Sequence, residues 1–187
     1  MIDHMADING LHQKLVIYVD KLAAKFINKY IPAKPGMRPS TYSDNVRAYC
    51  ILAHAAFEDY FENLSLEVLA YSTDKWITER SVNDVMLALL CLHGEKMKID
   101  DNENALEKKP FDYLKPIIES AKSSFSKAIK SNHGTSILYL RNLLIPLAIE
   151  ISTDANTLNS LRQLTDERGK YAHKGHVNST MAPEDAK

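Results

Sequence analysis

Helical periodicity is the feature that most constrains the fold of this chain. Apolar residues recur three and four positions apart along most of its length, which is the spacing of one face of an α-helix. One stripe holds Leu15, Val19, Leu22 and Phe26, and a longer one extends from Val46 to Val68. No run of alternating apolar and polar residues is long enough to predict a strand. The sequence therefore predicts an all-α fold.

Prolines, glycines and short polar runs divide these periodic stretches into a bundle of about five to seven helices. The expected breaks are Pro32 to Pro39, Gly94 to Pro110, Asn132 to Gly134, and Pro146, which ends or kinks an apolar helix. The last helix is expected to start near Thr153 or Asp154.

The length of 187 residues suits one domain with a core of its own. We expect a single helical domain over residues 11–176. Residues 1–10 would form an N-terminal tail, whose first residues resemble a cloning remnant, and residues 177–187 a flexible C-terminal tail.

Composition narrows the function classes. The net charge is -1, so a nucleic-acid site would have to be a local patch rather than a broad basic field. The two cysteines, Cys50 and Cys91, lie far apart, which predicts buried thiols in a cytoplasmic protein rather than a disulfide framework. No apolar run approaches the roughly 18 residues that span a bilayer, so no membrane association is expected.

Several familiar sites are missing from the sequence. The glycines are scattered singly, which excludes a phosphate-binding loop. The acidic run Asp100 to Asn104 resembles a calcium loop, but Ala105 replaces its glycine and Phe111 its final glutamate. His173 and His176 have no further ligand at zinc spacing. We therefore expect no metal and no cofactor, and a solvated acidic loop near residue 100.

The segment from Arg168 to His176 is the strongest candidate site. It contains Arg168, Lys170, Lys174 and two histidines without an acidic residue, which is a local cationic patch suited to phosphate. An alternative stays open, because basic residues also gather at helix C-termini to complement the helix dipole.

Spacing alone does not identify this site. A chain of this composition contains about 0.7 Arg-x4–6-His matches by chance, and Arg47 with His54 is a second match. That pair lies within an aromatic-rich amphipathic helix, where we expect packing or solvation. Arg168 instead follows the stripe Leu158, Leu161, Leu164, which is expected to anchor the last helix on the core.

Two segments together resemble a known family. The pattern Leu-x2-Leu-x2-Leu-x3-Arg-x3-Ala-His-x-Gly, which ends at Gly175, resembles the closing helix of HEPN domains (higher eukaryotes and prokaryotes nucleotide-binding). The segment Ala53 to Phe61 resembles an earlier core helix of these domains, in which small residues precede an aromatic residue and a glutamate. The resemblance covers residues 43–176.

This resemblance implies an all-α, usually dimeric domain whose Arg-x4–6-His motif forms a metal-independent endoribonuclease site. Arg168 and His173 would then be the catalytic pair. Many members are toxins or defence proteins, which implies an antitoxin or another protein partner, and others bind nucleotides or RNA without catalysis. The family often has Asn, Asp or His directly after the arginine, where this chain has Gly169.

The residue types suit RNA cleavage by attack of the 2′-OH on the adjacent phosphorus. His173 would act as general acid or base, because an unperturbed imidazole titrates near ~6.5. Arg168 would stabilise charge on the phosphoryl oxygens with its planar guanidinium. The expected substrate-binding residues are Lys170, Tyr171, Lys174 and His176, with Glu58 in a supporting role.

The helix itself sets a geometric condition. Arg168 and His173 lie ~140° apart around a regular helix and cannot both face one phosphate from it. Either the helix bends or ends near Gly169, or a two-fold homodimer completes the site, which we prefer. The sequence thus predicts a HEPN-type endoribonuclease. The alternatives are a non-catalytic module that binds RNA, a nucleotide or a protein, and a helical scaffold with no such site.

Overall fold

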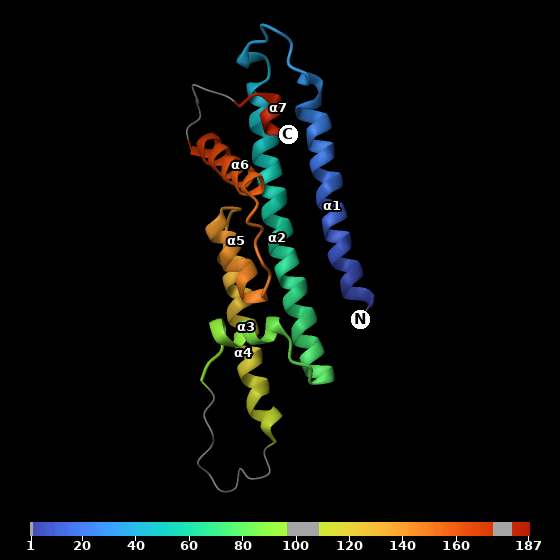
Figure 1. The fold of residues 1–187 in the computed structure, drawn as a ribbon, viewed down its shortest axis with the longest axis vertical. Coiled ribbons are helices and arrows are strands. Elements are labelled where there is room, and N and C mark those ends of the chain that lie inside the picture. The colour runs from blue at the N-terminus through green and yellow to red at the C-terminus, as the bar shows by residue number, and fades with distance from the viewer. Residues whose placement is uncertain (1, 97–108, 174–180) are drawn as a thin grey trace. The chain divides into compact units, whose positions relative to one another are not determined.

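The structure is a computed structural model that describes the backbone of residues 2–96, 109–173 and 181–187, with the side chains of 8–96, 109–171 and 181–187. Within these ranges it contains α-helices, short 3-10 helices and no strand, so the predicted all-α class is confirmed (Figure 1). The α-helices are α1 (Ile2–Phe26), α2 (Ser43–Glu79), α3 (Asp84–His93), α4 (Pro110–Ser131), α5 (Ile137–Leu144), α6 (Ala155–His173) and α7 (Pro183–Ala186). The 3-10 helices are η1 (Asn28–Tyr30), η2 (Pro39–Thr41) and η4 (Ile145–Leu147).

The chain groups into two compact units where the sequence suggested one domain over residues 11–176. Unit 1 comprises Met1–Phe61, His133–Leu140 and Ser152–Lys187, and unit 2 comprises Glu62–Asn132 and Arg141–Ile151. Helix α2 therefore contributes its first half to unit 1 and its second half to unit 2. The described residues predicted to carry function, among them Glu58, Arg168, Lys170 and Tyr171, belong to unit 1.

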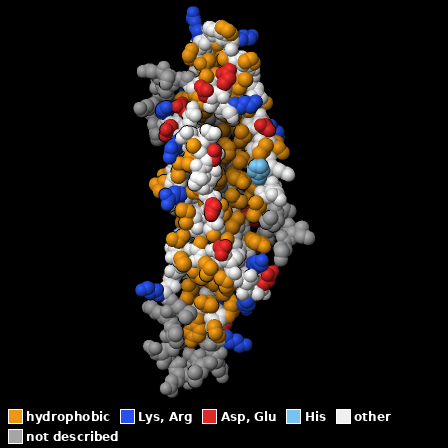
Figure 2. Space-filling model, in the orientation of Figure 1, with side chains coloured by type: hydrophobic (Ala, Val, Ile, Leu, Met, Phe, Trp, Pro, Cys, Tyr) orange, Lys and Arg blue, Asp and Glu red, His pale blue; other side chains and the backbone are white. Residues whose placement is uncertain are grey.

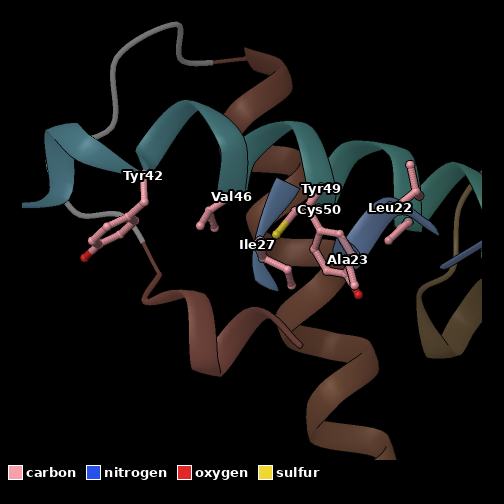
Figure 3. Close-up of a cluster of buried hydrophobic side chains, with 8 residues drawn as sticks. Leu22, Ala23, Ile27, Tyr42, Val46, Tyr49 and Cys50 are labelled. Carbon is pink, nitrogen blue, oxygen red and sulfur yellow. The ribbon is translucent and has the colours of Figure 1, made fainter. Parts of the chain in front are cut away.

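The core of unit 1 forms between α1 and the first half of α2. Leu22, Ala23 and Ile27 pack against the α2 side in one cluster, which Figure 3 shows gathered from both helices. Ile27 is fully buried, and burying an aliphatic side chain of that size contributes about 1.5–3 kcal/mol. The α2 side of the cluster consists of Tyr42, Val46, Tyr49, Cys50 and Ala53.

Helix α1 begins earlier than the sequence predicted. The expected tail at residues 1–10 is helical from Ile2 onward. Once the amphipathic stretch that follows has formed a helix, each added residue gains one hydrogen bond, and this segment contains no proline to stop it. Its glycine, Gly10, lowers helix propensity without ending the helix.

The C-terminal tail predicted at residues 177–187 is ordered in part. Helix α7 lies within it, Pro183 is buried, and Met181 and Ala186 pack against the unit 1 core. The Glu184 carboxylate accepts a hydrogen bond from the backbone N–H of Ala33. These apolar side chains explain the difference, because a tail that buries them offsets its ordering entropy. Residues 177–180 lie outside the described ranges.

Unit 2 has a separate core around the second half of α2. Trp76 is buried with Met86 and Ile118, as expected of a packing residue. Its ring stacks on Phe111 at 4.7 Å between centroids, and the Arg80 guanidinium lies 3.0 Å from the Phe111 ring centre. Helix α3 packs against α4 and η4.

The predicted helix breaks are confirmed where the structure describes them. Helix α4 ends at Ser131, before the Asn132 to Gly134 break. Helix α5 ends at Leu144, and Pro146 lies in the 3-10 helix that follows, because a proline inside an α-helix removes a hydrogen bond and clashes with the preceding turn. Most of the predicted acidic loop, residues 97–108, lies outside the described ranges. No described helix is long and apolar enough to cross a membrane.

Candidate functional site

Helix α6 positions Arg168, and two features fix the helix in unit 1. Asp154 caps its N-terminus, with a carboxylate oxygen that accepts bonds from the Thr157 N–H at 2.7 Å and the Thr157 hydroxyl at 2.9 Å. Leu164, from the predicted leucine stripe, packs against the unit 1 core. The start near Asp154 and the anchoring leucine agree with the sequence prediction.

The segment after α4 ties α6 to this unit one turn before Arg168. Thr135 is fully buried, and its hydroxyl lies 3.3 Å from that of Thr165. The Thr165 hydroxyl also donates to the Leu161 carbonyl at 2.8 Å. Because residues three apart lie on the same side of a helix, this contact brings the segment beginning at His133 close to the turn that carries Arg168.

The carboxylate of Glu58, on α2, is the centre of the polar groups in this region. It accepts a hydrogen bond from the Gly134 backbone N–H. Nδ1 of His133 lies 3.9 Å from the same oxygen, Oε1, and Nδ1 of His54 lies 3.8 Å from Oε2. We call the three side chains and this N–H the Glu58 cluster.

Gly134 has the backbone conformation that this arrangement requires. Its φ is +119°, a region that residues with a Cβ rarely adopt, and a Cβ there would lie 3.0 Å from the Tyr139 ring. The glycine therefore lets the chain reverse after α4 and direct its N–H at Glu58.

Arg168 lies close enough to this cluster to act on it electrostatically. His54 is buried, and desolvation lowers its pKa, with the neighbouring Glu58 charge opposing the shift and the Arg168 charge adding to it. Arg168 itself is exposed to solvent. Of packing and solvation, the two roles expected for His54, its burial shows packing, and the fold brings this histidine within electrostatic reach of the proposed catalytic arginine.

Lys170 forms an ion pair with Glu167, an acidic residue that lies just before the predicted cationic segment. Its Nζ lies 2.6 Å from Oε1 of Glu167, and this hydrogen bond raises the pKa of Lys170. Glu167 is buried and directly precedes the segment 168–176, which by itself contains no acid. The cationic patch is thus partly neutralised. The RNA-binding role of Lys170 stays a prediction.

Tyr171 faces the core of unit 1. It is half-buried against the cluster of Figure 3, and the Arg47 guanidinium lies 5.5 Å from its ring centre. Burial, followed by the nearby Glu167 carboxylate, raises the pKa of its hydroxyl, although the two groups form no hydrogen bond of normal geometry. Arg47 therefore serves packing, as predicted, while base stacking by Tyr171 stays a prediction.

Helix α6 continues through Gly169 to His173. The sequence left open a bend or an end of the helix near Gly169, or a site completed by a homodimer, and the continuous helix excludes the end at Gly169. A Cβ at Gly169 would meet nothing within 4 Å, so the glycine is not required by close packing. The side chain of His173, and residues Lys174 and His176, lie outside the described parts of the chain.

The Glu58 cluster contains residue types that also bind divalent metals. In unit 1, Nδ1 of His133 approaches one oxygen of the Glu58 carboxylate and Nδ1 of His54 approaches the other. A carboxylate this close to two imidazoles suits an electrostatic role for Glu58.

Sequence reasoning missed His133, which it treated only as part of a helix break. Gly134 and Glu58 are 76 positions apart, so no local spacing could join them. The available signal was the combination of a polar residue with a glycine directly after a helix, which is typical of a tight reversal.

Comparison with known protein families gives a match over most of the chain. A family model described as RiboL-PSP-HEPN matches residues 16–187 of this chain. The match includes the segments Ala53–Phe61 and Arg168–His173. No curated protein and no solved structure matches the chain.

Proposed function

This chain belongs to the HEPN family described as RiboL-PSP-HEPN, and on that premise we propose that it is a metal-independent endoribonuclease. The observation that carries the proposal is the placement of Arg168. Its side chain is exposed on α6, while its charge reaches the buried His54 of the Glu58 cluster. An exposed permanent cation beside polar and acid–base groups suits a phosphodiester substrate.

The proposed reaction is an internal transesterification of RNA. The 2′-oxygen attacks the adjacent phosphorus, the O2′–P bond forms as the P–O5′ bond breaks, and the 2′-OH proton leaves as O5′ gains one. His173 exchanges a proton as general acid or base, and Arg168 stabilises the charge on the non-bridging oxygens. The products are a 2′,3′-cyclic phosphate and a 5′-hydroxyl, and no metal is needed.

Cleavage of single-stranded RNA in EDTA tests this proposal. Arg168→Ala is expected to lower the cleavage rate about 10²–10³-fold, as loss of a transition-state donor does. His173→Ala is expected to lower it about 10²–10⁴-fold. Arg162→Ala is the matched control, because Arg162 is also an exposed arginine of α6. If the wild type leaves a panel of RNAs intact with and without EDTA, the enzyme proposal is wrong.

A second candidate is a non-catalytic module that binds RNA, a nucleotide or a protein. It is favoured by Gly169, which provides no side chain after the arginine, and by the ion pair that occupies Lys170. RNA binding without cleavage, with an affinity that falls steeply with salt, would support this second candidate.

A cytoplasmic toxin or defence role, with an antitoxin as partner, belongs to the catalytic proposal. It predicts that induced expression arrests growth only when Arg168 and His173 are intact.

A further inference from the structure

The proposed reaction needs two proton transfers, whereas the Arg168–His173 pair supplies one titratable group. One group must accept the 2′-OH proton, and another must protonate the departing 5′-oxygen. Arg168 is permanently charged and exchanges no proton near neutral pH. We therefore expect a second acid–base residue near Arg168, with a side chain that the substrate can reach.

The two described histidines of the Glu58 cluster differ sharply in this respect. The side chain of His54 is only 4% exposed, whereas that of His133 is 75% exposed. A phosphate group could contact His133 without any rearrangement of the fold, while His54 would first have to be uncovered. Exposure thus selects His133.

Position also selects His133. It directly precedes Gly134, whose N–H binds Glu58, and lies two residues before Thr135, which contacts Thr165 on α6. These bonds at its C-terminal side fix where His133 stands relative to the turn that carries Arg168. The Glu58 carboxylate lies 3.9 Å from Nδ1 of His133, close enough to act electrostatically on this ring.

We propose that His133 is the second acid–base residue of the ribonuclease reaction, with Glu58 as its positioning residue. This inference rests on the proposed function. His133 and His173 divide the two transfers: one takes the proton from the 2′-OH as the O2′–P bond forms, and the other gives a proton to O5′ as the P–O5′ bond breaks. Arg168 stabilises the charge on the phosphoryl oxygens.

An RNA whose scissile linkage carries sulfur in place of the bridging 5′-oxygen tests this division. A thiolate leaves without being protonated, because thiols are far stronger acids than alcohols. The variant that lacks the general acid should therefore recover on this substrate, whereas the variant that lacks the base should not. His133→Ala and His173→Ala are each expected to lose about 10²-fold or more on normal RNA. One of the two is then expected to recover to within about tenfold of the wild type.

The matched control is His12→Ala, which removes an exposed histidine of α1 outside the site. Circular dichroism and thermal melting of each variant verify folding, which an exposed side chain such as His133 should not disturb. The inference is overturned if His133→Ala cleaves normal RNA like the wild type. It is equally overturned if His133→Ala is impaired and neither histidine variant recovers on the sulfur substrate. A wild type that cleaves neither substrate would instead refute the proposed function.

Discussion

At the scale of single residues, two histidines beside the same carboxylate differ because one is buried and the other is exposed to solvent. His54 and His133 approach the same carboxylate within 0.1 Å of the same distance, at 3.8 Å and 3.9 Å. One is enclosed by unit 1 and the other faces solvent. Desolvation lowers the pKa of the buried ring, His54, which couples its protonation to folding.

The stability of the protein should therefore depend on pH through His54. Its folded-state pKa is lowered from the usual value of 6.5, so below about pH 6.5 the unfolded chain binds a proton that the folded chain does not. Stability is then fully present above about pH 6.5 and is lost as the pH falls through the folded pKa. We expect the urea midpoint to decrease between pH 7.5 and pH 5, with a smaller decrease in His54→Gln.

His93 contributes in the same direction, since burial also lowers its pKa, so His93→Gln should reduce the slope as well. The matched control is His12→Gln, at an exposed histidine of α1. A His54→Gln variant with an unchanged slope would show that this histidine is not the coupled group.

The two cysteines should react very differently with thiol reagents. Cys50 is buried in the unit 1 core, and burial raises the pKa of its thiol to about 12, while Cys91 is exposed. At pH 8 we expect a disulfide reagent to label one thiol per folded chain and two in denaturant. Cys91→Ser should abolish labelling of the folded chain, and labelling that persists in that variant would contradict the burial of Cys50.

At the scale of elements, one glycine inside a helix and one at a helix end should respond oppositely to alanine. Gly169 lies inside α6 with open space around its Cβ direction, so Gly169→Ala should stabilise by about 0.5–1 kcal/mol. Gly94 caps α3, and a Cβ there would collide with the Leu90 carbonyl, so Gly94→Ala should destabilise. Urea unfolding of both variants measures this, and a stability loss in Gly169→Ala would indicate a special backbone role at that position.

The helices were largely predictable because each one carries its own apolar stripe and its own end signals. Pro146 and the cap at Asp154 act within a few residues, and both appear where the pattern placed them. The start of α1 and the helix α7 were missed for the opposite reason. Helix propagation beyond Leu11 and the packing of Met181 on a distant core are not encoded in local spacing.

The candidate site was predictable only in part. Arg168 could be singled out from its own helix and from the family resemblance. Its neighbours come from elsewhere in the chain, since Glu58 and His54 lie on α2 and His133 follows α4. The pair of Glu167 and Lys170 is local and could have been read from its i,i+3 spacing.

At the scale of the whole molecule, the charged side chains do not mark out one face for binding RNA. The net charge is -1, and Figure 2 shows acidic and basic side chains interspersed over the face that it presents. On the proposed function, we expect RNA binding to come from a few phosphate contacts near Arg168, or from two copies of that region brought together. The geometry of helix α6 also favours the second of these, in which two copies of the chain come together.

Because α6 is continuous from Ala155 to His173, positions 168 and 173 lie ~140° apart around one helix axis. One phosphate is then best served by Arg168 of one chain and His173 of a second. We expect light scattering at micromolar concentration to give about twice the chain mass of 21.1 kDa. A monomer that cleaves RNA at full rate would contradict this arrangement.

Mixing two inactive variants tests the shared site directly. In a dimer of Arg168→Ala with His173→Ala, one of the two composite sites would combine an intact arginine with an intact histidine. Random exchange makes about half of the dimers mixed, each with one of two sites restored, so the mixture should recover about a quarter of wild-type activity. If both residues act within one chain, each chain of the mixture lacks one of them and activity should stay at the level of the separate variants. Arg162→Ala mixed with His173→Ala is the control, and it should show no more activity than its Arg162→Ala component provides.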